Sequence, residues 1–306
     1  MFARFMRSAA LYALALLLPI SAIAATPPSN ADQHAVLFRV EKAGVPPSWL
    51  FGTVHVADPR VTHLSQPISD AYTSSDHIYT EVRLDFGVMM EMAKTVLRPE
   101  GDLLSDHIDK AHYEKLLPAL AARQYPEVAT RRLYTWAAAM LMVAPVKETG
   151  QLPLDLMLAK MSVEGGKDYQ GLETIAEQLS LFQAIPEDKQ RALLYSLLDH
   201  PEEAAAQLKQ LIDAYVKRDL PDVLKLEEEP DTTMSAADAK WFEHWLKYPM
   251  LLERNHRFID RLKDPLTTGN AFIAIGALHL PGNEGVVNLL RQAGYTVTPV
   301  IDTPAQ

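Results

Sequence analysis

Segments with the hydrophobic pattern of β-strands lie near both ends of the chain, and helical periodicity fills the middle. His34 to Val40 alternates between apolar and polar positions as a half-buried strand does, and a Gly/Pro turn leads it into Trp49 to Val54. This arrangement predicts a β-hairpin. Further strands are expected at Ile78 to Leu84, Ala271 to Ile275 and Tyr295 to Ile301.

The stretch from Gly87 to Lys263 has apolar residues at helical spacing, and Pro and Gly interrupt it at intervals. Helices are predicted at Phe86 to Leu97, Ser105 to Gln124, Pro126 to Val143, Leu152 to Val163, Glu173 to Ala184, Glu187 to Leu198, Pro201 to Arg218 and Ala236 to Leu262. A short strand is expected at Lys167 to Gly171. The apolar run Trp136 to Val143 is too short for a membrane span, which needs roughly 20 residues, and is interpreted as core. The pattern predicts an α/β fold whose sheet comes from the N- and C-terminal strands, with a large, mostly helical insertion.

The first residues have the features of a secretory signal peptide. Arg4 and Arg7 form a basic region, Ala9 to Leu18 an apolar region, and Ala22-Ile-Ala24 a cleavage site. We therefore expect a signal peptide at residues 1–24, a single domain at residues 25–306, and a periplasmic or secreted protein. The absence of cysteine from the sequence excludes disulfides, thiolate metal sites and a lipoprotein signal.

The amino-acid composition and net charge limit the kinds of molecule that the protein can bind. The apolar share of 48% is ordinary for a globular protein. The formal charge of −10 becomes −12 after signal cleavage, because two arginines and no acidic residue are removed. An acidic surface without a basic stripe argues against nucleic acid, and no later segment is expected to insert stably into a membrane. Nucleic acid is therefore not an expected partner.

Two copies of a Gly-x-x-His motif follow apolar strands. They are Gly52-Thr-Val-His55 and Gly276-Ala-Leu-His279, and Glu81 lies inside another predicted strand. Side chains at the carboxyl ends of neighbouring parallel strands converge, so both imidazoles and the carboxylate can form a divalent-metal site with positions left for water. A bound water of lowered pKa could attack a carbonyl. Alternatively, each histidine packs or makes a hydrogen bond at a strand end, and each glycine turns the chain.

Five segments of the sequence resemble, in order, the blocks of the TraB/GumN (TraB/PrgY/GumN) family. They are Trp49 to Pro59, the strand with Glu81, Tyr169 to Gln178, Leu252 to Asn255 and Phe272 to Val300. That family is similar to the Tiki metalloproteases, and more distantly to erythromycin esterase and ChaN-like proteins. The resemblance implies an α/β fold with an active centre formed by Gly52, His55, Glu81, Gly276 and His279. It also implies peptide-bond hydrolysis with a divalent metal, manganese or cobalt rather than zinc.

The other residues in these blocks have two interpretations each. Arg254 either stabilises an oxyanion or binds a substrate carboxylate, or it forms an ion pair with Glu173 or Glu81; the first is favoured. Glu173 and Gln178, expected at a helix start, are explained equally well by structure and by a site. The role of Asn255 stays open. The remaining motif-free histidines are treated as surface or core residues: His63, His77, His107, His112, His200, His244 and His256.

The favoured function is a periplasmic metal-dependent hydrolase, most simply a peptidase, with His55, Glu81 and His279 as metal ligands and Arg254 as an assisting cation. A second hypothesis is a non-catalytic protein that sequesters a peptide or a metal complex in the same pocket. A third is an esterase that acts on a small molecule. The sequence does not separate peptide from ester.

Overall fold

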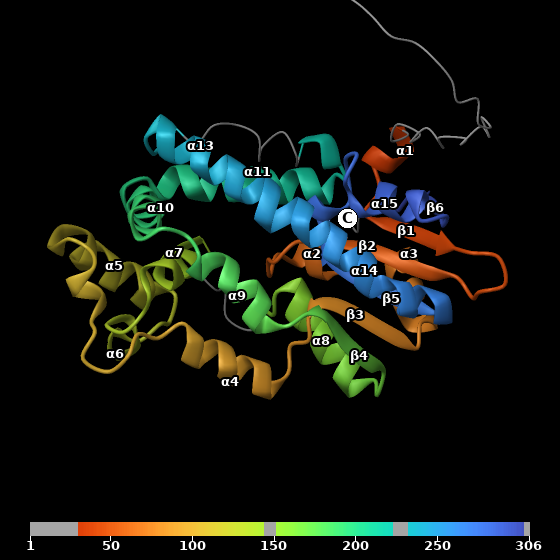
Figure 1. Ribbon diagram of the computed structural model, residues 1–306, viewed down its shortest axis with the longest axis horizontal. Helices are drawn as coiled ribbons and strands as arrows, with labels where there is room; N and C mark the ends of the chain where they lie inside the picture. Colours follow the sequence, from red (N-terminus) through yellow and green to blue (C-terminus); the bar gives the residue numbers. More distant parts are fainter. Residues whose placement is uncertain (1–29, 144–150, 223–231, 303–306) are drawn as a thin grey trace, which may run out of the picture.

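The computed structural model describes residues 30–143, 151–222 and 232–302, so the predicted signal peptide at residues 1–24 lies outside the described residues. A lobe that contains the sheet lies beside a lobe made of helices (Figure 1). The first described helix, α1 (Asn30–Gln33), and the last strand, β6 (Thr296–Val300), both belong to the sheet lobe.

Within the described residues, six strands form one mixed sheet in the order β4-β3-β5-β2-β1-β6. The other strands are β1 (Leu37–Glu41), β2 (Ser48–Thr53), β3 (His77–Val82), β4 (Asp168–Glu173) and β5 (Ala271–Gly276). β1 is antiparallel to β2 and to β6, which confirms the predicted hairpin, whereas β2, β5, β3 and β4 run parallel. The predicted α/β fold with a sheet from both chain ends is confirmed.

β2 and β5, the strands that precede the two Gly-x-x-His histidines, are parallel neighbours. Their register pairs Gly52 with Ile275 and Thr53 with Gly276. The apolar run of β5 is buried from Ala271 to Ile275, as expected for a central strand covered on both faces. The two motifs therefore end at the same edge of the sheet, nearly level with each other.

The edge strand β4 comes from inside the helical insertion and pairs with β3. It matches the strand expected at Lys167 to Gly171 but continues to Glu173. The prediction that Glu173 begins a helix was therefore wrong, because Glu173 pairs with Val82 across the strands and the helix is capped by Thr174. The side chain of Glu173 therefore lies at the carboxyl edge of the sheet, beside the strand that carries Glu81.

The helical insertion follows the predicted periods with local differences. Among the described residues, the α-helices after α1 are, in chain order, α2 (Pro59–Thr62), α3 (Gln66–Ser74), α4 (Phe86–Thr95), α5 (Lys110–Ala122), α6 (Glu127–Thr130), α7 (Thr135–Val143), α8 (Leu154–Glu164), α9 (Ile175–Gln183), α10 (Glu187–Asp199), α11 (Pro201–Val216), α13 (Ala236–Trp245), α14 (Glu253–Thr268) and α15 (Val286–Gln292). The helix predicted at Pro126 to Val143 is broken where Leu133 forms a β-bridge with Leu97. The one predicted at Ala236 to Leu262 contains a π-helical segment, η2 (Leu246–Leu252), and continues to Thr268.

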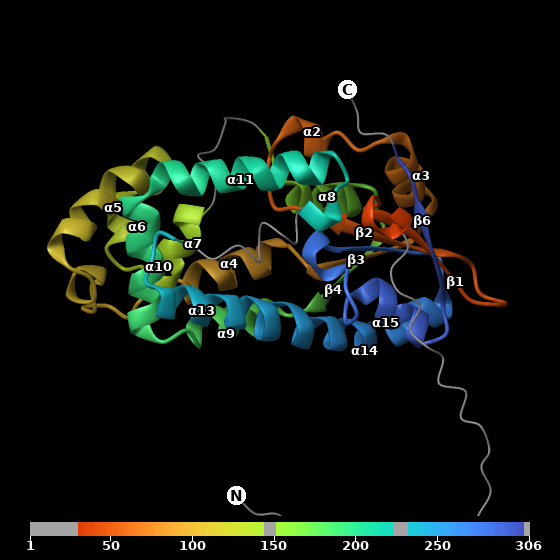
Figure 2. The same ribbon diagram turned by 90° about the horizontal axis from the view of Figure 1, so that it is seen from above.

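Two hydrophobic clusters stabilise the two lobes. The larger cluster surrounds the sheet, and the smaller one joins α5, α7, α9 and α10. Trp136 and most of the apolar residues after it on α7 are buried in the smaller cluster, which supports their interpretation as core. The run α13-η2-α14 extends from the helical lobe to the sheet (Figure 2). Among the described residues, no helix is both long and apolar enough to cross a membrane.

Candidate active centre at the carboxyl edge of the sheet

His279 is buried at the end of η3 (Ala277–His279), the 3₁₀ turn that follows β5. Its Nδ1 lies 2.6 Å from Asn255 Oδ1, and its Nε2 lies 3.1 Å from Arg254 Nη1. The amide orientation of Asn255 is fixed because its Nδ2 donates to the carbonyl of Glu284. Since an amide oxygen can only accept and a guanidinium can only donate, Nδ1 of His279 carries the proton and Nε2 presents a lone pair. Burial lowers the pKa of His279 to about 4, so the ring is neutral.

Glu81 lies near the end of β3 and is nearly completely buried. Its Oε1 accepts from the Gly276 backbone N–H at 2.7 Å, and its Oε2 accepts from Arg254 Nη2 at 2.6 Å and from Gln178 Nε2 at 3.0 Å. Burial alone would raise the pKa of Glu81, but the positive charge of Arg254, with the charge of His55 and the Gly276 backbone donor, lowers it to about 2. The carboxylate is therefore ionised at the pH of any cell compartment.

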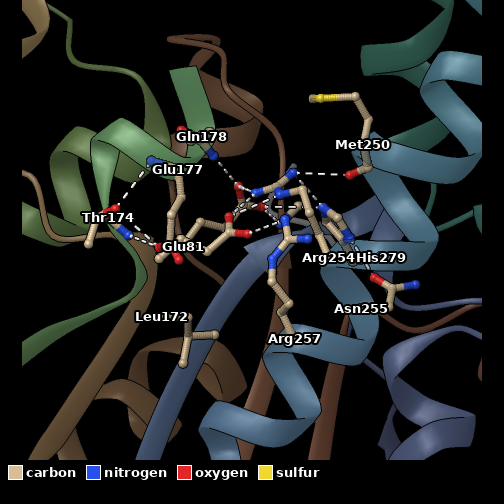
Figure 3. A network of polar contacts seen from close by, with 12 residues as sticks. Glu81, Leu172, Thr174, Glu177, Gln178, Met250, Arg254, Asn255, Arg257 and His279 are labelled. Carbon is tan, nitrogen blue, oxygen red and sulfur yellow. Dashed lines mark hydrogen bonds and ion pairs between the residues drawn. The ribbon is translucent and has the colours of Figure 1, made fainter. Parts of the chain in front are cut away.

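Arg254 connects the acidic residues and His279 in one network (Figure 3). Its Nε donates to Glu173 Oε2 at 2.9 Å, while Nη2 lies 2.6 Å from Glu81 Oε2 and 2.8 Å from Glu173 Oε2. The other oxygen of Glu173 accepts from Arg257 Nη2 at 3.1 Å. Both ion pairs that were posed as the alternative to a functional role are thus present, and they lie inside the candidate site.

His55 makes no hydrogen bond to this network among the described residues and is held instead by α8. It follows β2, and its Nδ1 lies 2.6 Å from Oδ2 of Asp155 on α8, whose Oδ1 accepts from Thr53 Oγ1 at 2.9 Å. The Asp155 carboxylate raises the pKa of His55 to about 9, although 65% of the imidazole side chain is exposed, so water screens part of this attraction. The charge of His55 also favours the ionised form of Glu81, so the two groups share one electrostatic environment.

The motif glycines allow close approach and do not simply turn the chain. Neither Gly52 nor Gly276 has a positive φ. A Cβ on Gly52 would lie 2.5 Å from Leu280 Cδ1 and 3.1 Å from Ala277 Cα, and a Cβ on Gly276 would lie 3.2 Å from Glu81 Oε1. The first motif's glycine therefore makes room for the turn that carries the second motif's histidine.

Replacing Gly52 with valine is expected to destabilise the protein by about 1–3 kcal/mol, because the side chain overpacks the turn next to His279. The measurement is urea unfolding of the variant against Gly87→Val, where the exposed position on α4 brings a Cβ no nearer than 3.3 Å to Asp85 Oδ1. Equal stability losses in the two variants would show that Gly52 has no packing role.

The donor chemistry of the site fits a divalent ion. Each imidazole is fixed through Nδ1 by a side-chain oxygen, and Glu81 supplies a charged oxygen. Nε2 of His279 already presents a lone pair, whereas Nε2 of His55 becomes a ligand atom when a metal ion displaces its proton. No three His, Asp or Glu side chains in the described part of the chain are already grouped as ligands of one ion. Two of the donor atoms, on Glu81 and His279, are instead bonded to the Arg254 guanidinium.

Comparison with known protein families matches residues 36–299 to the TraB/PrgY/gumN family. The chain belongs to the TraB/PrgY/gumN family. The match spans nearly the whole sheet, the helical insertion and the network around Arg254, and it confirms the family resemblance.

Curated relatives of this TraB/PrgY/gumN protein are named metalloproteases. Metalloprotease TIKI1 of Danio rerio is 26% identical over 315 residues, which are 88% of this chain and 63% of that protein. Metalloprotease TIKI2 of Xenopus tropicalis is 25% identical over 327 residues, with 89% and 61% covered, and metalloprotease TIKI1 of Homo sapiens is 25% identical over 323 residues, with 88% and 63% covered. The chain thus spans less than two thirds of the length of these relatives. No solved structure matches it significantly.

The printed names of these relatives imply a metal in those proteins without specifying which one. Three residues of the site have roles that the sequence did not indicate. Asp155 orients His55, Gln178 donates directly to Glu81, and Asn255 fixes the tautomer of His279. Asn255 and Gln178 at least lie within the family-like blocks, whereas nothing in the local sequence around Asp155 distinguishes it from any other acidic residue in a helix.

Proposed function

We propose that this TraB/PrgY/gumN protein is a periplasmic or secreted metal-dependent hydrolase that cleaves peptide bonds. The observation that carries the proposal is the shared geometry of the two motif histidines. Both are anchored through Nδ1 to an oxygen acceptor, Asp155 for His55 and Asn255 for His279, and both keep Nε2 for another partner. Metal-ligating histidines are typically oriented in this way by a second partner.

The chain's own residues have separable tasks in this proposal. His55, Glu81 and His279 hold the ion, which supplies a water of lowered pKa when it is bound. Asp155, Asn255 and the Gly276 backbone N–H hold these three ligands in place. Arg254 supplies a buried positive charge to a carbonyl oxygen that becomes negative during hydrolysis. We further propose manganese or cobalt as the ion, by similarity to the Tiki relatives.

The proposed location follows from the basic, apolar and cleavage regions of residues 1–24. The acidic composition supports a peptide or small-molecule partner rather than nucleic acid.

The test is hydrolysis of a peptide library by the purified mature protein. We expect cleavage that a chelator abolishes and that manganese or cobalt restores, because the ligands alone do not activate water. A parallel set of small ester substrates separates an esterase from a peptidase. Retention of peptides without cleavage, in the presence of each metal, would contradict the hydrolase proposal and favour a binding protein.

A further inference from the structure

The guanidinium of Arg254 bonds to the same atoms that the proposed metal site needs. Nη2 lies 2.6 Å from Glu81 Oε2, and Nη1 lies 3.1 Å from His279 Nε2. His279 Nε2 and Glu81 Oε1 are themselves 3.8 Å apart. A divalent ion held by His279 and Glu81 would use the lone pair of His279 Nε2 that now accepts from Arg254.

The charges around the site are balanced without any ion. Glu81 and Glu173 are buried carboxylates, with side chains 9% and 0% exposed, and Arg254 and Arg257 are the guanidiniums that bond to them. A divalent cation added to this cluster would place excess positive charge beside Arg254, in surroundings where water screens charges weakly. The guanidinium and the ion therefore disfavour each other at Glu81 and His279.

Arg254 has other partners that it can keep if it moves away from Glu81 Oε2 and His279 Nε2. Its Nε and Nη2 both contact Glu173 Oε2, and Nη1 also lies 3.2 Å from the Met250 carbonyl in η2. The Glu173 carboxylate, which belongs to the neighbouring strand end, can thus hold the guanidinium while Glu81 turns to another cation. Arg254 then stays next to the site, where its freed N–H groups can face a substrate oxygen.

We propose that Arg254 is the built-in cation of the metal-free centre and that it competes with the divalent ion for Glu81 and His279. The inference rests on the proposed metal-dependent function and assigns Arg254 a second role, as a residue that limits metal affinity. Metal loading exchanges one cation for another at Glu81, and Glu173 retains the displaced guanidinium.

The experiment is calorimetric titration of manganese, cobalt and zinc into the folded wild type, Arg254→Gln and Arg257→Gln at one fixed pH. We expect Arg254→Gln to bind the ion at least about tenfold more tightly than the wild type. Arg257→Gln is the matched control, because it removes the same charge from the other oxygen of Glu173 and makes no recorded contact to Glu81 or His279. Its affinity should stay within about twofold of the wild type.

A second pair of variants covers the case in which Arg254→Gln does not fold. Arg254→Gln combined with Glu173→Gln removes one positive and one negative charge together, and is compared with Glu173→Gln alone. The double variant should again bind more tightly than its parent. If the wild type binds metal and loss of Arg254 leaves the affinity unchanged or weaker, the proposed competition is wrong, whereas the proposed metal-dependent function still stands. Binding by none of the proteins would overturn the proposed metal-dependent function as well.

Discussion

Arg254→Gln is expected to destabilise the protein by about 3–5 kcal/mol, because it leaves two buried carboxylates with one guanidinium fewer. Glu173 would lose its bonds to Nε and Nη2 and keep only Arg257, and Glu81 would keep the Gly276 and Gln178 donors. Both carboxylates are largely shielded from water, since the side chains of Glu173 and Glu81 are 0% and 9% exposed. The uncompensated charge, and not the loss of a contact as such, produces the cost.

The measurement is a double-mutant cycle by urea unfolding with wild type, Arg254→Gln, Glu173→Gln and the double variant. We expect the double variant to recover a substantial part of the stability that Arg254→Gln loses, since removing both partners of a buried pair is far less costly than removing one. Arg131→Gln is the control, because its contact with Glu127 joins side chains that are 58% and 56% exposed, and such pairs contribute about 0–1 kcal/mol. Additive losses in the cycle would show that Arg254 and Glu173 are not coupled.

The fold could be predicted from the sequence wherever hydrophobic pattern and turn residues agreed. The run from Ala271 to Ile275 is apolar at every position, which is typical of a central parallel strand, and strand β5 begins at Ala271 as predicted. The sequence predicts too short a strand β4 and places Glu173 in the following helix, because strand ends and helix starts accept the same residue types. Only the pairing with β3 decides where the strand ends.

The sequence predicts the histidines of the site that follow strands, but not the residues that hold them in place. His55 and His279 are predicted site residues because each belongs to a similar motif after a strand-like run. The parallel pairing of β2 and β5 places both motifs at the same edge of the sheet. Asp155 is 100 residues from His55 in the chain, on a helix with no motif of its own, so only the tertiary structure reveals their contact. From the sequence, a functional role and an ion pair are alternatives for Arg254. The structure gives it both acidic partners within the site itself.

The histidines that lack a motif provide controls for the metal site. His112 is stacked on Tyr195 at 3.6 Å and bonded to Asp109 and Asp199, so its removal would disturb the helical lobe. His200, at the start of α11, is 42% exposed and contacts only Glu203 among the ion pairs recorded for the described residues. His200→Ala is therefore the better matched control for loss of one imidazole without loss of folding.

The central claim, that His55 and His279 hold one divalent ion, is tested most directly by metal titration of His55→Ala, His279→Ala and His200→Ala, with circular dichroism to establish folding. We expect manganese or cobalt to bind the wild type and His200→Ala alike. Each motif variant should lose more than about 100-fold in affinity, since loss of a ligand exceeds the 10- to 100-fold cost of losing an outer partner. A wild type that binds none of manganese, cobalt and zinc, or two motif variants that bind as tightly as the wild type, would contradict the claim.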